Sequence, residues 1–283
     1  YIDLYRLAGR KMIDIEGERT LMPSLLPPKI GHTNGIIGFA FKNIKQLILC
    51  LGTFSSLPFD FFIKVCGKGN LQMNTAGMLP LLKLDNKFAQ EIIARTIMLN
   101  CLTTYYSAVW KDCFDDSYTQ IHWSKVDRRL NNYSFERLNK EWEYSYPLRT
   151  AYERRQAMVE LDVLVAMALK MNIKQLKSAY LVQFPTLQQH ENDTYYDSIG
   201  QIAYAKNNAL NGVGFARAEW ENGIKGAPAG QRFYRTIMDD TVPGGPIERT
   251  IEYVAPFDRC NREEDYEVAW NFFEEKYGKS DTV

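Results

Sequence analysis

Residues 47–82 read LILCLGTFSSLPFDFFIKVCGKGNLQMNTAGMLPLL, and the organisation of the chain follows from this stretch. An apolar run from Leu47 to Phe54 is followed by the break Ser55-Ser56 and by an aromatic-rich run from Phe59 to Val65. The pattern predicts two buried segments that present one exposed polar loop. The competing interpretation is a helix and a connector in an ordinary core. The loop carries side chains that can recognise hydrogen-bonding edges: Lys68, Asn70, Gln72, Asn74 and Thr75.

The composition indicates a folded chain with an uneven distribution of charge. Of 283 residues, 46% are hydrophobic and 24% are charged, so a packed core is expected. The net charge is zero, yet residues 1–83 hold ten Lys or Arg against five Asp or Glu, a net of +5. A neutral total can therefore conceal a local basic face, and binding to phosphates requires only such a face.

The sequence also indicates the compartment in which the protein works. None of the five cysteines forms a Cys-x-x-Cys pair, which favours free thiols in a reducing compartment. There is no apolar run of about 18 residues and no signal-peptide pattern, so we expect a cytoplasmic protein without a membrane span. The chain starts in mid-pattern at Tyr1, and we interpret it as a piece of a longer protein.

The periodicity of the sequence predicts a mixed α/β (α+β) chain with three regions. We expect residues 1–84 to form a strand-rich domain that carries basic side chains. Residues 85–190 should form a helical bracing region, because apolar residues recur there at helical spacing. Residues 191–283 should form an irregular region that ends in an acidic helix.

Two helices are predicted by their capping residues. Thr150 and Glu153 form a capping box in front of a long apolar stripe, so residues 151–170 should be a helix. Asn172 can cap a second helix that runs from Ile173 to Gln183. The two helices should pack as a hairpin.

Three further segments are predicted from hydrophobic spacing. Residues from Phe88 to Trp110 have helical spacing, and residues from Arg249 to Val254 alternate like a strand. Residues from Pro256 to Gly278 combine acids on one face with aromatic side chains on the other, which predicts the terminal helix.

No catalytic signature is present in the sequence. The three histidines are isolated and lack the spacing of metal ligands, and the glycine motifs for phosphate or dinucleotide binding are incomplete. An amino-methyltransferase needs an Asn-Pro-Pro-aromatic tetrapeptide to hold an exocyclic amine. The double proline Pro27-Pro28 lies instead between Leu26 and Lys29. We therefore expect no catalysis and no bound cofactor from this chain alone.

The opening stretch resembles the closing part of target-recognition domains in type IIG-like and type I specificity proteins. Those domains show an apolar segment, a serine-containing break, an aromatic run with Asp and Lys, a variable loop and a Leu-Pro-Leu or Leu-Pro-Ile end. The matching residues here are Leu49 to Leu51, Ser55-Ser56-Leu57, Phe59 to Lys64, Lys68 to Leu71 and Leu79-Pro80-Leu81.

The wider chain is similar to the C-terminal half of large adenine-specific DNA methyltransferases of the Eco57I-like class found in DISARM-type anti-phage systems. The segments that carry the similarity are Arg10 to Asp14, Glu18 to Leu21, Pro147 to Ala157, Val182 to Glu191, Pro243 to Thr250 and Ala255 to Cys260. The resemblance implies that residues 1–84 are a target-recognition-like domain. It also implies an upstream methyltransferase domain, which would bind S-adenosylmethionine and flip the target adenine out of the duplex.

The resemblance implies that this chain grips double-stranded DNA and selects the adenine. Basic side chains could neutralise phosphates or pair with guanine, and amide side chains have the geometry that reads adenine N6 and N7. The candidate DNA-binding residues are Arg6, Arg10, Lys11, Arg19, Asn34, Lys68, Asn70, Gln72 and Asn74. The first alternative is a protein-interaction module that docks partner defence subunits. The second is an enzyme with an unrecognised site.

Overall fold

The protein is described by a computed structural model over residues 1–206, 213–240 and 244–278. Its N-terminal part is a three-stranded antiparallel sheet with the order β2-β1-β3. The strands are β1 (Arg6–Arg10), β2 (Pro23–Leu26) and β3 (Ile36–Ala40). The strand-forming residues of the region 1–84 therefore all lie before residue 41, and helices follow.

The opening stretch folds into two consecutive helices, α1 (Ile44–Phe54) and α2 (Leu57–Val65). The two helices meet at an angle of 65° across the Ser55-Ser56 break. Asp162 on another helix accepts a hydrogen bond from the Leu57 amide at 2.6 Å and so satisfies the start of α2. Both helices are buried over most of their length, and the polar loop after them contains only the single turn α3 (Met73–Ala76).

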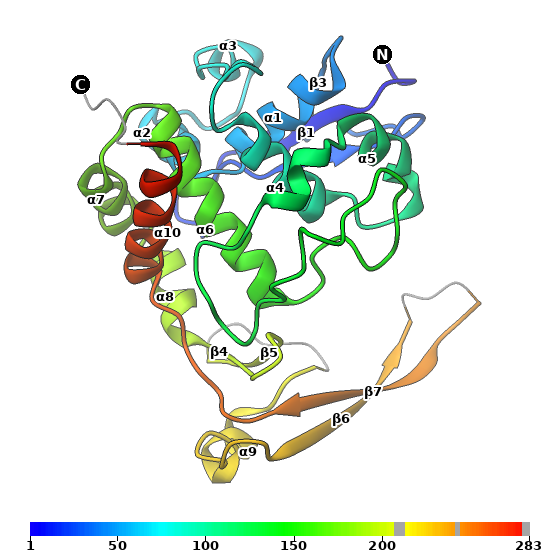
Figure 1. Cartoon of the computed structure of the whole chain (residues 1–283), viewed down its shortest axis with the longest axis vertical. Helices are drawn as coiled ribbons and strands as arrows, with labels where there is room; N and C mark the ends of the chain where they lie inside the picture. Colours follow the sequence, from blue (N-terminus) through cyan, green and yellow to red (C-terminus); the bar gives the residue numbers. More distant parts are fainter. Residues whose placement is uncertain (207–212, 241–243, 279–283) are drawn as a thin grey trace.

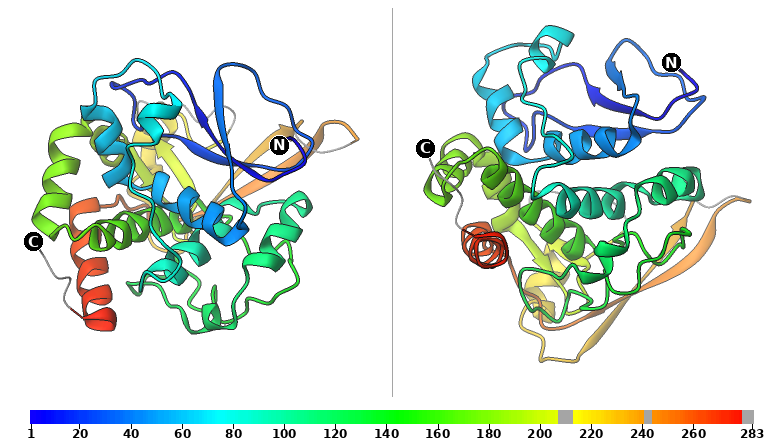
Figure 2. Two further views of the ribbon diagram at one scale, coloured as in Figure 1. Left: turned by 90° about the horizontal axis from the view of Figure 1, so that it is seen from above. Right: turned by 45° about the horizontal axis from the view of Figure 1, so that its top comes forward.

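A helical layer packs beneath α1, and its central member is α6 (Ala151–Ala168). Around α6 lie α4 (Ala89–Asn100), α7 (Ile173–Gln183), α8 (Pro185–Asp193) and α10 (Arg262–Tyr277). Figure 2 shows the N-terminal sheet and α1 on one side of this layer and the C-terminal strands on the other. The other helical elements are α5 (Ser107–Cys113), α9 (Arg217–Glu219), η1 (Thr104–Tyr106), η2 (Asp116–Gln120) and η3 (Trp220–Ile224).

Two small antiparallel pairs complete the fold. The first is β4 (Thr194–Tyr196) with β5 (Ile202–Ala205), and the second is β6 (Arg232–Asp239) with β7 (Ile247–Val254). The β6–β7 pair extends from the body as a long ribbon (Figure 1). Its base is held by an aromatic cluster in which the rings of Tyr204 and Trp220 stack at 4.8 Å.

The mixed α/β class is confirmed, and so are both capped helices. The capping box at Thr150 is present, and α7 has the predicted bounds. The segment from Phe88 to Trp110 differs, because α4 ends at Asn100 and a new helix, α5, begins at Ser107. The terminal helix begins later than expected, at Arg262, because Asn261 caps it by accepting from the Glu263 and Glu264 amides.

One hydrophobic core extends from Leu7 to Phe273 and is shared by the sheet and the helical layer. The predicted boundaries after residues 84 and 190 fall within this core, and the division into domains stays a prediction. Residues 207–212, 241–243 and 279–283 of the predicted C-terminal region lie outside the described residues. Within the described residues, no single helix has the length and apolar character to cross a membrane; only the bent pair α1–α2 passes that test jointly.

Candidate nucleic-acid interface

Three segments that are far apart in sequence meet where β1 ends. Beyond Arg10, the Lys11 amide donates to the Gly35 carbonyl at 2.8 Å on one side. On the other side the Leu71 amide donates to the Lys11 carbonyl at 2.7 Å. The polar loop after α2 is therefore aligned with the extension of β1 by backbone hydrogen bonds. It lies close to the loop that enters β3.

This arrangement brings seven of the nine predicted DNA-binding residues to one end of the sheet, where its central strand β1 ends. Six of the seven are exposed, and Lys11 is half-buried. We call this group the polar edge; its members are Arg10, Lys11, Asn34, Lys68, Asn70, Gln72 and Asn74. The edge can offer guanidinium, ammonium and amide groups to one ligand, and duplex DNA requires this combination of donors and acceptors.

A shallow hollow of about 520 Å³ lies within the polar edge. Lys11 lines it and holds its ammonium 3.1 Å from the Asn34 side-chain oxygen. Gln72 and Asn74 also line it, and the Asn74 oxygen accepts from the Thr75 amide at 2.8 Å. This bond orients the Asn74 amide with its NH₂ group left to donate. Met73 lies between the two amides and is 63% exposed.

The structure corrects the placement of Arg6. This side chain is buried, donates to the Ile30 carbonyl and lies with its guanidinium carbon 5.1 Å from the centre of the Tyr1 ring. It holds the loop that contains Ile30, and because it is buried it is not available to a phosphate.

The structure also corrects the placement of Arg19. Its Nε atom lies 2.9 Å from a carboxylate oxygen of Asp60, which is fully buried in α2. The same carboxylate accepts from the Thr20 and Leu21 amides at 3.0 and 2.8 Å. Arg19 therefore neutralises a buried acid and fastens the segment before β2 to α2. The sequence does contain a signal for this pairing. Asp60 lies inside an aromatic run that is expected to be buried, and a buried carboxylate requires a cationic or hydrogen-bonding partner.

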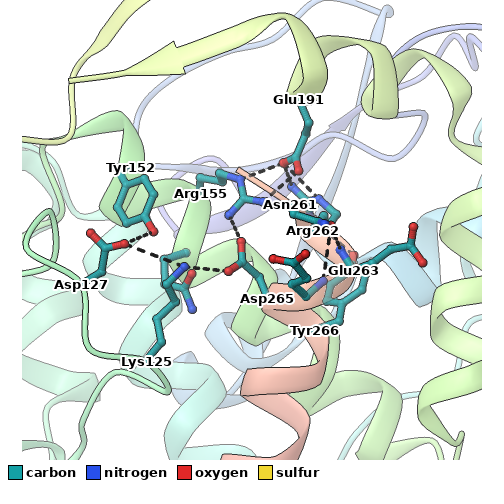
Figure 3. A network of polar contacts seen from close by, with 12 residues as sticks. Lys125, Asp127, Tyr152, Arg155, Glu191, Asn261, Arg262, Glu263, Asp265 and Tyr266 are labelled. Carbon is teal, nitrogen blue, oxygen red and sulfur yellow. Dashed lines mark hydrogen bonds and ion pairs between the residues drawn. The ribbon is translucent and has the colours of Figure 1, made fainter. Parts of the chain in front are cut away.

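A second polar site lies in the helical layer, away from the polar edge (Figure 3). Arg155 on α6 donates to Glu191 at 2.9 Å through Nε and to Asp265 at 2.6 Å through Nη1. Arg262 donates to the same Glu191 carboxylate at 2.9 Å and to Asp162 at 3.0 Å. Burial alone would raise the pKa of Glu191, but the guanidinium groups of Arg262 and Arg155 lower it to about 2.

We call these side chains the ionic network: Arg155, Arg262, Glu191, Asp265 and Asp162. Their positive and negative charges pair with one another. Each of its two arginines contacts two carboxylates, and together they link α6, α8 and α10. The arrangement braces the helical layer, and we assign no chemistry to it. The partners of Arg155 lie on α8 and α10, which the sequence alone could not place beside α6.

A third set of charges is buried beside the middle of α6. Arg95 on α4 is fully buried and donates to Glu160 at 2.6 Å and to Glu91 one turn earlier. Glu160 also accepts from the Ser124 amide at 2.7 Å, so its second oxygen is satisfied. Over the part of the chain that the structure describes, no group of three His, Cys, Asp or Glu side chains could hold a metal ion.

Comparison with known proteins adds no family assignment. No protein-family model, no curated protein and no solved structure matches this chain.

Proposed function

We propose that this chain recognises duplex DNA in a sequence-specific way, as the specificity portion of an adenine-N6 DNA methyltransferase in a restriction-modification or anti-phage system. An upstream methyltransferase domain would supply S-adenosylmethionine and the catalytic residues. The observation that carries the proposal is the polar edge, where residues 10–11, 34 and 68–74 converge although they lie on three separate segments.

The polar edge provides both kinds of contact that a specific DNA interface needs. Arg10 and Lys68 are exposed charges that can neutralise phosphates and so position the duplex. Asn70 and Gln72 are exposed amides that can donate to and accept from the edge of an adenine in the major groove. Because Arg6 is buried and Arg19 is paired with Asp60, the predicted phosphate contacts are Arg10, Lys11 and Lys68.

The phosphate contacts are tested by the salt dependence of binding. Replacement of Arg10 and Lys68 by Ala should weaken binding to duplexes of any sequence and reduce the slope of log K against log salt by about 2, since each phosphate contact contributes about 0.9. The measurement is fluorescence anisotropy with a labelled duplex at a series of salt concentrations.

The matched control removes two exposed lysines elsewhere, Lys140→Ala together with Lys174→Ala. This control should bind as the unchanged protein does. If the slope is equal in both double variants, the polar edge does not contact DNA phosphates. If the affinity of the unchanged protein does not depend on salt, the proposal of DNA binding is wrong.

The amide contacts are tested by sequence preference. Asn70→Ala should change which duplexes are enriched from a randomised pool more than it changes overall affinity, because a base contact distinguishes sequences and a phosphate contact does not. Asn132→Ala removes an exposed amide far from this loop in sequence and should leave the enriched sequences unchanged. Identical enrichment by both variants would exclude Asn70 as a base contact.

A protein-docking module is the second candidate function, and the β6–β7 ribbon favours it. The ribbon exposes Tyr234, Met238 and Ile247, which are large apolar side chains of the kind enriched at protein interfaces. The same titration separates the candidates. A docking module would bind duplexes weakly, and that binding would not depend on Arg10 and Lys68.

A further inference from the structure

A partly apolar pocket of the helical layer lies between the segment that precedes β2 and the helices α4, α6 and α8. Its volume is about 480 Å³, which is within the range of small-molecule sites. The apolar side chains that line it include Leu21, Met22, Leu99, Met158, Leu187 and Ile202. We call it the Arg154 pocket. None of its lining residues belongs to the polar edge.

The charged residues that line the pocket are mostly compensated. Arg155 and Arg262 bind Glu191 at 2.8 and 2.9 Å, and Figure 3 shows these three side chains together. Glu18 at the rim is hydrogen-bonded to Nδ1 of His190 at 2.7 Å. Both lining acids therefore already have cationic or hydrogen-bonding partners, so they repel an incoming anion less than free carboxylates would.

Arg154 lines the pocket and takes no part in these ion pairs. Its Nη1 atom donates to the carbonyls of Leu99 and Leu148 at 2.9 and 3.3 Å, and no described carboxylate pairs with it. Its Nε and Nη2 groups make no hydrogen bond to described residues and are not among the enclosed unpartnered atoms. This edge of the guanidinium is therefore accessible, and it is the edge that binds carboxylate or phosphate in a bidentate manner.

Tyr196 supplies a second donor in the same pocket. Its side chain is buried, with 8% of the residue exposed, and its ring contacts Tyr152 edge to face at 5.5 Å. Its hydroxyl forms no hydrogen bond with the described residues, yet it is not one of the enclosed unpartnered atoms. Burial raises the pKa of Tyr196, so the hydroxyl remains protonated and can donate.

We propose that the Arg154 pocket binds a small ligand that carries one carboxylate or phosphate group on an apolar body. The anionic group accepts from the free edge of Arg154 and from the Tyr196 hydroxyl. The body lies against Met158, Leu99 and Ile202. The proposal is independent of DNA recognition, because it uses a different set of residues.

The ligand class is tested by calorimetric titration with matched pairs of probes. One pair is adenosine 5′-monophosphate and adenosine, the other is 3-phenylpropionate and 3-phenylpropanamide, and inorganic phosphate is titrated alone. At least one charged probe should bind about tenfold or more tightly than its neutral partner, as expected for charge-assisted hydrogen bonds. The pair that shows this difference identifies phosphate or carboxylate as the anionic group.

Two substitutions locate the binding in this pocket. Tyr196→Phe removes the hydroxyl but keeps the ring contact, so the fold should be retained and the preferred charged probe should bind about tenfold more weakly. Arg154→Gln should weaken it further, but it also removes the bonds to two carbonyls. The controls are Tyr133→Phe and Arg137→Gln, both at exposed positions, and they should bind as the unchanged protein does.

Two results would overturn the proposal. The first is that no charged probe binds at millimolar concentration more tightly than its neutral partner. The second is that the charged probe binds equally well to the unchanged protein and to a folded Tyr196→Phe variant, since the ligand would then lie elsewhere.

Discussion

The role of an arginine in this protein depends on whether other segments cover its side chain. Arg6 and Arg10 are four residues apart on β1 and therefore point to the same face of the sheet. Arg6 lies under Tyr1 and the loop containing Ile30, whereas Arg10 stands at the end of the strand, where it is exposed. Sequence chemistry could not separate them, because the covering residues come from other segments.

Asp60 shows the reverse case, in which the need for a partner is visible in the sequence but its identity is not. An ionised carboxylate in a run of aromatic side chains must be paired and hydrogen-bonded when it is buried. Arg19, Thr20 and Leu21 satisfy it, and they lie about forty residues earlier in the chain.

Asp60→Asn should destabilise the protein by about 3 kcal/mol, because it leaves the Arg19 guanidinium without its buried partner. The measurement is the midpoint of unfolding in urea. Glu136→Gln, at an exposed acid, should change the free energy of unfolding by no more than about 0.5 kcal/mol and leave the midpoint nearly unchanged. Equal midpoints for the two variants would mean that the Asp60 contacts contribute no net stability.

At the scale of elements, local capping residues predicted the helices with the most accurate bounds. At α6, the Glu153 amide donates to the Thr150 hydroxyl at 3.2 Å, and the Glu153 carboxylate accepts from the Thr150 amide. At α7, Asn172 and Gln175 bond in the same reciprocal way at 3.0 and 2.8 Å. These signals lie within four residues, so they do not depend on the rest of the fold.

Thr150→Ala should cost about 1 kcal/mol, because it leaves the Glu153 amide at the start of α6 without its acceptor. Thermal unfolding followed by circular dichroism measures the loss. Ser178→Ala, at an exposed position within α7, is the control, and its effect should stay within about 0.5 kcal/mol of zero. If both variants melt at the same temperature, the capping box does not contribute to stability.

The hydrophobic pattern of the sequence did not predict the strand β6. Its sequence places Phe233 and Ile237 on the face toward the aromatic cluster but also Tyr234 and Met238 on the opposite, exposed face. The alternation of apolar and polar residues is therefore lost. Only the pairing with β7, in register from Arg232–Val254 to Asp239–Ile247, makes the segment a strand.

At the scale of the whole molecule, the ionic network makes stability depend on pH. The pKa of Glu191 is about 2 in the folded protein, compared with its ordinary value of 4.5, because Arg262 and Arg155 offset the effect of burial. A carboxylate with a lowered pKa stabilises the fold fully above its unfolded value. This stabilisation should be present above about pH 4.5 and be lost as the pH falls toward 2.

The melting temperature of the protein should therefore decrease between pH 4.5 and 2. Glu191→Gln should lower stability at neutral pH and flatten this dependence, whereas Glu136→Gln should leave it unchanged. Differential scanning calorimetry at several pH values measures both effects. An unchanged pH dependence in Glu191→Gln would show that this carboxylate does not control acid unfolding.

The sequence by itself determined the mixed α/β class, the capped helices α6 and α7, and the residue types of the polar edge. Each of these depends on hydrophobic spacing or on hydrogen bonds between near neighbours, which are local properties. Only the tertiary structure decided that Lys11, Asn34 and Gln72 converge, that Arg6 and Arg19 do not, and that Arg154 and Tyr196 share a pocket. These outcomes depend on contacts between distant segments, which pack according to the shape of the whole core.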